Sequence, residues 1–213
     1  MEDITTPREK ILKKVRASLL NKFAFHFPDV DQESEVFHFP EQDIAVNFAK
    51  KFTSQGGGFV FCHNAFDFNE NLIMFLEKRG IKHLVCQETE LSKEMQNLGL
   101  QVEPAYGEDA DKEAVLVSAE ALISRSGAVM LSSQSTGYDL FAGRGTLLIQ
   151  AKLSRLAPDM KQAMVLLKNR YGARLPSLFT FVHGPAKIVG GNREDIKSPD
   201  FRKELIVFLV NDK

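Results

Sequence analysis

Hydroxyl groups and glycine are concentrated in the stretch Ser132-Ser-Gln-Ser-Thr-Gly137, which directly follows an apolar run. Free backbone N–H groups converge in short connections of this kind, so α/β proteins commonly bind an anion or a small substrate there. The same residue types also suit a tight turn between core strands, because serine and glycine are permissive in turns. The residues alone favour the turn, and anion binding is the alternative.

A second group of polar residues lies on the glycine-rich loop that begins at His183 and contains Lys187 and Arg193. A histidine, a lysine and an arginine on one loop after a strand could clamp a carboxylate or a phosphate. Alternatively, residues 192–195 form the first turn of a capped helix, and the glycines only shape the turn. Both interpretations stay open at this point.

Cys62 and His63 are neighbours that could supply a nucleophile and a base. Adjacent residues of a strand point to opposite faces, however, so the two side chains are not expected to meet. We expect Cys62 to be a small buried hydrophobic residue. His63 should lie on the loop at the end of the strand, where it could act as an acid or a base if a partner were present.

Several other motifs are excluded as sites. Gly56-Gly57-Gly58 precedes a predicted strand, whereas a dinucleotide-binding fingerprint follows one. Residues 184–191 contain no Walker-type phosphate loop. The tetrad Phe-His-Phe-Pro occurs at residues 25–28 and 37–40, and its two histidines could meet at a metal ion. No carboxylate or thiol lies at a spacing that completes such a site, so we expect an extended arm anchored by aromatic rings, and no metal.

The elements that position these residues alternate between helix and strand after residue 41. The predicted strands are near-continuous apolar runs at residues 58–62, 83–86, 114–118, 127–131, 146–151, 178–182 and 204–210. The predicted helices cover residues 42–53, 69–78, 92–97 and 157–170. This order indicates a three-layer α/β fold, with a mostly parallel sheet and helices on both faces. Ligands bind beyond the carboxyl ends of such strands, which selects residues 62–64, 132–137 and 183–185.

The N-terminal segment has a clear helix start. Thr6 is placed as the N-cap, Pro7 as the first helical residue, and Glu9 completes a capping box. Apolar residues then recur at helical spacing as far as Leu20, which predicts a helix that covers the domain core as a lid, with a docking arm as the alternative. We expect a helix and extended arm over residues 1–40 and one α/β domain over residues 41–213.

The composition is that of an ordinary soluble globular protein. With 27 basic and 28 acidic residues, the net charge of -1 gives no field that would attract nucleic acid or an anionic membrane. The acidic N-terminus does not have the pattern of a signal peptide, and the apolar run at residues 205–210 is too short to span a bilayer. The two cysteines form no disulfide or zinc pattern, so we expect a reduced, cytoplasmic location without membrane insertion.

Two motifs in this order of elements resemble the LUD domain, the lactate utilisation protein B/C family, and especially its single-domain C-type members. The first motif lies within residues 119–131, where Ser124-Arg125-Ser126-Gly127-Ala128 occupies the place of the family's Ala-Asp-Thr-Gly-Thr type sequence. The second is Gly184-Pro185, after which the family usually continues Ser-x-Thr-Ala-Asp. The resemblance covers most of the chain. This chain departs from the family pattern at Arg125, which replaces an aspartate, and at residues 186–191.

The resemblance implies both a fold and a metabolic role. The family is similar in fold to ribose-5-phosphate isomerase, glucosamine-6-phosphate deaminase and the CoA-transferases. Its C-type members are linked to the oxidation of L-lactate to pyruvate alongside iron–sulfur proteins. This chain lacks a cluster-binding set of cysteines, so an iron–sulfur cluster would belong to a partner protein, and we expect no cofactor bound by this chain itself.

The first hypothesis is therefore a LUD-type protein of lactate or related organic-acid utilisation, acting in a redox complex and binding a small anionic ligand. Hydroxyl and backbone N–H groups would orient the anion, and the basic side chains would neutralise it. The expected ligand-binding residues are Ser124, Arg125, Ser126, Gly127, Ser132, Ser133, Ser135, Thr136, Gly137, Arg144, His183, Gly184, Pro185 and Lys187.

Two other functions stay open. One is an enzyme of the sugar-phosphate isomerase or CoA-transferase type, which needs a carboxylate base near the anion, and for which Glu120, Asp139 and Glu194 are the candidates. The other is a non-catalytic binding or scaffold subunit whose residues 1–40 dock on a partner. The changed polar residues of the two family motifs favour the scaffold over the enzyme.

Overall fold

The computed structural model describes residues 6–20, 43–104, 113–135, 146–184 and 204–212. The chain divides into two compact units, Met1–His38 and Phe39–Lys213, which are described separately. The domain boundary that we predict after residue 40 falls between the described ranges. No helix in the described ranges is long and apolar enough to cross a membrane.

The first unit contains the helix α1 (Pro7–Leu20), which confirms the predicted N-terminal helix. The capping box is present: the Thr6 backbone N–H donates to Glu9 Oε2 at 2.9 Å, and the Glu9 N–H donates to Thr6 Oγ1 at 3.4 Å. The apolar side chains of Ile11, Leu12 and Val15 are exposed. Within its own unit, α1 therefore buries none of these three side chains.

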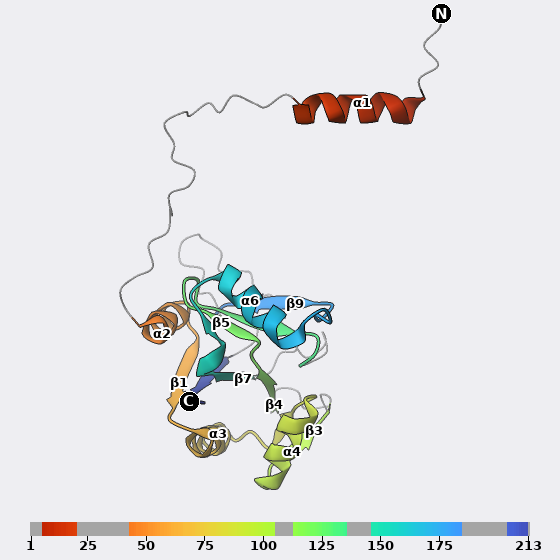
Figure 1. The fold of residues 1–213 in the computed structure, drawn as a ribbon. Coiled ribbons are helices and arrows are strands. Elements are labelled where there is room, and N and C mark those ends of the chain that lie inside the picture. The colour runs from red at the N-terminus through yellow and green to blue at the C-terminus, as the bar shows by residue number, and fades with distance from the viewer. Residues whose placement is uncertain (1–5, 21–42, 105–112, 136–145, 185–203, 213) are drawn as a thin grey trace, which may run out of the picture. The chain divides into compact units, whose positions relative to one another are not determined.

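The second unit is built on a six-stranded sheet in which every pairing is parallel. Its strands in spatial order are β1 (Gly58–Cys62), β10 (Leu205–Val210), β7 (Thr146–Lys152), β4 (Glu113–Ser118), β2 (His83–Val85) and β3 (Gln101–Glu103). All six residues of β10 are buried, because this strand lies inside the sheet and both of its faces are covered. The parallel α/β architecture that the sequence predicts is thus confirmed (Figure 1).

A second, mixed sheet packs beside the first. Its order is β8 (Leu156–Ala157), β5 (Ala121–Ile123), β6 (Ala128–Ser132) and β9 (Phe179–Val182). The apolar runs at residues 127–131 and 178–182 are strands, as predicted, but they pair antiparallel in this sheet instead of joining the parallel one. The reason is the tight turn after β5, where the Gly127 N–H donates to Ile123 O at 2.9 Å and leaves no room for a crossover helix.

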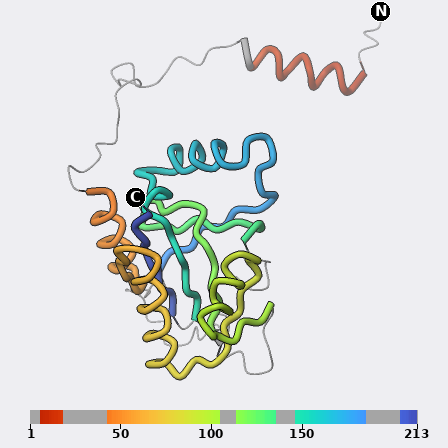
Figure 2. The backbone as a smooth tube through the Cα atoms, turned by 60° about the horizontal axis from the view of Figure 1, so that its bottom comes forward, coloured from red at the N-terminus to blue at the C-terminus, as the bar shows by residue number. Residues whose placement is uncertain are grey.

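Helices cover both sheets (Figures 1 and 2). On one face of the parallel sheet pack α3 (Ala65–Arg79) and α4 (Thr89–Asn97), through a core that includes Phe68, Leu72 and Met95. The other face packs against α2 (Ile44–Ser54) and the second sheet. The helix α6 (Met160–Tyr171) lies on the outer face of the second sheet, on the side of the strands opposite α3.

Capping side chains decide where several helices begin. Asn64 accepts a hydrogen bond from the Asp67 N–H at 2.9 Å, so α3 starts at Ala65 and not at residue 69 as predicted. Asp159 accepts from the Gln162 N–H at 2.8 Å, which starts α6 three residues later than predicted. The short strands β3, β5 and β8 are absent from our prediction, because two or three residues carry no periodic signal.

Candidate functional site

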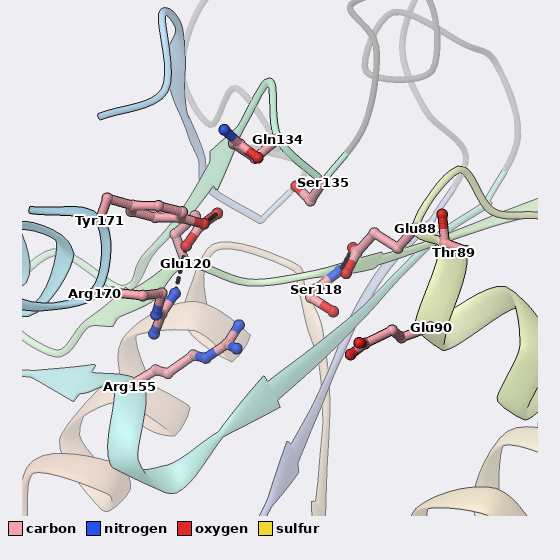
Figure 3. Close-up of a pocket in the computed structure, with 10 residues that line it drawn as sticks. All are labelled: Glu88, Thr89, Glu90, Ser118, Glu120, Gln134, Ser135, Arg155, Arg170 and Tyr171. Carbon is pink, nitrogen blue, oxygen red and sulfur yellow. Dashed lines mark hydrogen bonds and ion pairs between the residues drawn. The ribbon is translucent and has the colours of Figure 1, made fainter. Parts of the chain in front are cut away.

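Two cavities open at the carboxyl edge of the parallel strands, which is where α/β sheets usually bind ligands. The first cavity, of about 420 Å³, lies between the carboxyl ends of β2, β4 and β6, the short helix η2 (Leu153–Arg155) that follows β7, and the last turn of α6. Figure 3 shows the side chains that line it. The polar groups on which its chemistry depends are Glu88, Ser118, Glu120, Arg155, Arg170 and Tyr171.

Glu120 is the fixed centre of the first cavity's wall. Only 4% of the residue is exposed, and it sits in the connection between β4 and β5. Its Oε1 accepts hydrogen bonds from Ser132 Oγ at 2.6 Å and from the Tyr171 hydroxyl at 2.8 Å. Its Oε2 forms an ion pair with Arg170 Nη1 at 2.5 Å. Burial and the bond to Glu120 raise the pKa of Tyr171, so its hydroxyl stays a proton donor to the carboxylate.

Glu88 differs from Glu120 because it has no ion pair of its own in the described residues. It occupies the N-cap position of α4 without a capping bond from its side chain, and its Oε1 accepts a hydrogen bond from the Ser118 backbone N–H at 2.5 Å. Burial raises the pKa of Glu88, although the Ser118 bond and the charge of Arg155 oppose that shift. A carboxyl group whose pKa lies above its ordinary value can exchange a proton with a ligand, as a general acid or base.

Arg155 is the half-buried cation of the first cavity. Its Nη1 donates to Ala119 O at 2.5 Å, and this is its one hydrogen bond among the described residues. Burial and the nearby charge of Arg170 lower the pKa of Arg155, but a guanidinium stays charged in proteins. In Figure 3 its guanidinium points into the space between Arg170 and Ser118. The other N–H groups of Arg155 are therefore placed to receive an anion.

The second cavity, of about 370 Å³, lies above the carboxyl ends of β7 and β10 and beside the first turns of α3 and α4. It shares Glu88, Glu90, Ser118 and Arg155 with the first cavity. On its rim, Asp212 accepts hydrogen bonds from the Ser154 N–H at 2.9 Å and from Ser154 Oγ at 2.5 Å. Burial disfavours the charge of Asp212, but these bonds outweigh it and lower its pKa.

The structure places part of the predicted serine-rich stretch at the first cavity. Ser135 lines the cavity, and Ser132 supports it from behind through its hydrogen bond to Glu120. Ser133 is exposed and its hydroxyl lies 3.3 Å from that of Ser177, away from the cavity lining. Thr136, Gly137 and Arg144 lie outside the described residues.

The predicted residues Ser124, Ser126 and Gly127 form the turn between β5 and β6, and this turn packs against α2. Ser124 Oγ donates to Ile44 O at 2.7 Å, and the Ser126 carbonyl accepts from Gln55 Nε2 at 3.0 Å. None of the three residues lines either cavity. Their contacts hold the hairpin on the helix, which is a structural task.

Arg125 belongs to the same turn. Its side chain is exposed, and its backbone N–H donates to Pro158 O at 3.1 Å, so the turn is also tied to the chain that leads into α6. Arg125 lines neither cavity. The charge of Arg125 therefore does not belong to a wall of either cavity.

The described residues that were predicted after the strands β9 and β1 also lie outside the two cavity linings. His183 is exposed, and Gly184 packs so closely on the turn after α2 that an added Cβ would come within 2.6 Å of Gly57 N. Pro185 and Lys187 lie outside the described residues. Cys62 is buried as predicted, and burial raises the pKa of its thiol to about 11, which keeps it unreactive.

His63 lies at the end of β1, as predicted, and its ring contacts that of Phe61 edge to face at 5.3 Å. In the part of the chain that the structure describes, no three His, Cys, Asp or Glu side chains lie close enough together to hold a metal ion. The candidate site is therefore described by its carboxyl, guanidinium and hydroxyl groups.

Sequence reasoning did not select Glu88, Ser118 or Arg155, although a signal for them exists. Each of these residues lies at or just after the carboxyl end of a predicted parallel strand, the same criterion that selected Cys62 to Asn64. Arg170 and Tyr171 carry no such signal, because they lie at the end of a helix whose position depends on the second sheet. Glu120, considered as a possible base, is instead held in a complete set of hydrogen bonds.

Comparison with known proteins gives a likeness in fold. No protein-family model matches the chain, and no curated protein matches it in sequence. The structure is similar to the crystal structure of a DUF162 family protein from Deinococcus radiodurans, with a TM-score of 0.58 and 14% sequence identity over 78% of this chain and 96% of that chain. DUF162 corresponds to the LUD domain family. At this identity the likeness establishes that the two chains share their α/β fold.

Proposed function

We propose that this chain is a LUD-type protein of lactate or related organic-acid utilisation that binds a small hydroxy acid in the first cavity. The observation that carries the proposal is Arg155, a half-buried cation with one hydrogen bond among the described residues and with its other N–H groups directed into the cavity. The fold likeness to a DUF162 family protein supports it, and so do the motifs at residues 119–131 and 184–185.

The residues around Arg155 suit the two functional groups of a hydroxy acid. The guanidinium would hold the ligand carboxylate through two parallel N–H bonds, which is the preferred geometry of an arginine–carboxylate pair. The ligand hydroxyl would then lie near Glu88 and Ser118, which share the same cavity wall. Arg170 is already neutralised by Glu120, so Arg155 would supply the main attraction.

Oxidation of a hydroxy acid to a keto acid releases two protons and two electrons. Glu88 is suited to accept one of the protons, because burial raises its pKa, and the other proton would pass to water. The electrons need an acceptor, and we propose an iron–sulfur partner protein for this role, since the two cysteines of the chain cannot hold a cluster. Purification of the tagged chain from its native cells should bring down an iron–sulfur protein, and repeated failure to do so would count against the complex.

Thermal unfolding with added ligands tests the binding proposal directly. Lactate and pyruvate should raise the melting temperature, because a ligand that binds only the folded state stabilises it. The variant Arg155→Gln should lose this shift. Arg174→Gln is the matched control, since Arg174 is an exposed arginine that lines neither cavity. A wild-type protein that no carboxylate stabilises, or a shift that survives in Arg155→Gln, would contradict the proposal.

Glu88 favours a second candidate function, an enzyme of the sugar-phosphate isomerase type. Such an enzyme moves a proton between neighbouring carbons of its substrate, and a carboxyl group with a raised pKa can carry that proton. Incubation with ribose 5-phosphate in D2O would then exchange a carbon-bound proton for deuterium, and Glu88→Gln would abolish the exchange. If no anion binds at all, the non-catalytic scaffold becomes the better hypothesis.

A further inference from the structure

The two cavities are neighbours that share part of their walls. Glu88, Ser118 and Arg155 belong to the walls of both, so the Arg155 guanidinium stands where the cavities meet. An anionic group bound there would leave the rest of its molecule free to extend over the ends of β7 and β10. The size and lining of that second space indicate what kind of molecule fits it.

Both cavities are larger than a three-carbon acid requires. Their volumes are about 420 Å³ and about 370 Å³, and cavities of roughly 300–1,000 Å³ hold drug-sized ligands. Lactate placed at Arg155 would leave most of both spaces filled with water. A longer molecule would displace this water and gain contacts on both sides of the guanidinium.

The wall that belongs only to the second cavity carries acceptors and donors of both charge signs. Glu94 comes from α4, Gln150 and Lys152 from β7, and Asn211 and Asp212 from the chain after β10, while Ala65, Leu91 and Val210 supply an apolar part of the lining. Among the described residues, the Glu94 carboxylate makes no hydrogen bond or ion pair, and the Lys152 ammonium makes none either, although its charge acts on nearby Asp212. Hydroxyl groups both donate and accept hydrogen bonds, so they can pair with the Glu94 carboxylate and the Lys152 ammonium, whereas an apolar chain could contact only the apolar part of the lining.

We infer that the ligand is a polyhydroxylated acid of the sugar-acid class, with its carboxylate on Arg155 and its hydroxylated chain in the second cavity between Glu94 and Lys152. This inference rests on the proposed binding of a hydroxy acid at Arg155, and it extends that proposal by assigning the second cavity to the same ligand. It makes Glu94 a specificity-determining residue, because Glu94 contacts only the part of the ligand that lactate lacks.

Isothermal titration of the full chain with three acids tests the inference. Gluconate should bind about tenfold more tightly than lactate, because its extra hydroxyls make several further hydrogen bonds of modest net strength. Hexanoate has a chain of the same length without these hydroxyls, and it should bind no better than lactate. In Glu94→Ala the advantage of gluconate should fall several-fold while lactate affinity is unchanged. Glu77→Ala, an exposed glutamate of α3 outside both cavities, is the matched control.

Each failure has a separate meaning. If lactate binds and gluconate binds no more tightly, the inference that one ligand occupies both cavities is wrong, whereas the proposed function stands. If hexanoate binds as tightly as gluconate, the inference that the ligand is polyhydroxylated is wrong. If gluconate binds Glu94→Ala as tightly as the wild type, the inferred position of its hydroxylated chain beside Glu94 is wrong. If neither lactate nor gluconate binds, the proposed function fails, and the inference fails with it.

Discussion

Two arginine–glutamate ion pairs of equal length differ in burial, and burial decides how much each pair contributes to the stability of the fold. The pair Arg170–Glu120 and the pair Arg79–Glu204 both have N···O distances of 2.5 Å. The Glu120 side chain is 5% exposed, whereas those of Arg79 and Glu204 are 51% and 32% exposed. Water therefore screens the Arg79–Glu204 pair. The Glu120 carboxylate, in contrast, belongs to a buried hydrogen-bond network that also includes Ser132 and Tyr171.

Replacement of these two glutamates should therefore have unequal effects. Glu120→Gln removes the counter-charge of Arg170, whose side chain is 31% exposed, and takes a charged acceptor out of the buried network, so we expect a loss of about 1–3 kcal/mol in the free energy of unfolding. Glu204→Gln, the control, should cost less than about 1 kcal/mol, as exposed ion pairs do. Urea denaturation of both variants measures the difference. Equal losses would show that Glu120 is no more important than a surface carboxylate.

Glu88 should give the stability of the protein a specific pH dependence. Its pKa is raised above the ordinary value of 4.5, chiefly by burial, so the folded state holds this proton at a pH where the unfolded state has released it. The stability contribution is complete below the unfolded pKa and is lost as pH rises through the folded pKa. Asp212, whose pKa is lowered, acts in the opposite sense, since its contribution is lost as the pH falls.

The comparison of wild type with Glu88→Gln isolates this effect. Above pH 4.5 the unfolding free energy of the wild type should fall relative to that of the variant, until Glu88 is fully ionised in the folded state. Chemical denaturation over a series of pH values gives both curves. Parallel curves for the two proteins would mean that Glu88 titrates as it does in the unfolded chain.

At the scale of elements, the turn between β5 and β6 shows why one glycine is required. Gly127 has a φ of 67°, and a Cβ added there would lie 2.9 Å from the Phe52 backbone nitrogen of α2. The turn and the helix are thus in contact through backbone atoms, which side-chain rearrangement cannot relieve. The position combines left-handed backbone with close packing.

A pair of alanine variants separates these two constraints. Gly99→Ala introduces a side chain at a φ of 83° with nothing within 4 Å, and it should cost about 1–2 kcal/mol of stability from backbone strain. Gly127→Ala adds the contact with α2 to the same strain, so its loss should be clearly larger. Thermal or urea unfolding tests the order of the two variants. A smaller loss in Gly127→Ala would mean that α2 moves away easily.

Most elements of the fold could be predicted from the sequence, and the site could be predicted only in part. The seven predicted strands are continuous apolar runs, and the bounds of each lie within one residue of the prediction, whereas the short strands β3, β5 and β8 were not predicted. Their division between two sheets was not visible, because an apolar run such as β6 does not show which strand it pairs with. Arg170 and Tyr171 reach the cavity only through this second sheet and α6, so no spacing in the sequence connects them to Glu120.

At the scale of the whole molecule, the two units differ in how much apolar surface they bury. Among the residues that the structure describes, the buried clusters consist of residues between Phe48 and Val210, all within the second unit. In the first unit, Ile11, Leu12 and Val15 are exposed. The stability of the second unit is therefore expected to depend on its own core.

A chain that begins at residue 39 tests this expectation. We expect its melting temperature to lie within about 2–4 °C of that of the full chain, which corresponds to about 1 kcal/mol for a protein of this size. A much larger decrease would show that residues 1–38 cover the core, as the lid interpretation of α1 requires. Differential scanning calorimetry of the two proteins gives the comparison.

The position of β10 has a consequence for the order of folding. β10 pairs with β1 on one side and with β7 on the other, so strands far apart in the chain meet only through it. Until residues 205–210 have been synthesised, β1 and β7 each present an unpaired edge that could join a neighbouring chain. Pairing over such long sequence separations is also slow. Insertion of β10 pairs both of these inner edges at once, and it leaves β1 with only the outer edge that this strand has in the finished sheet.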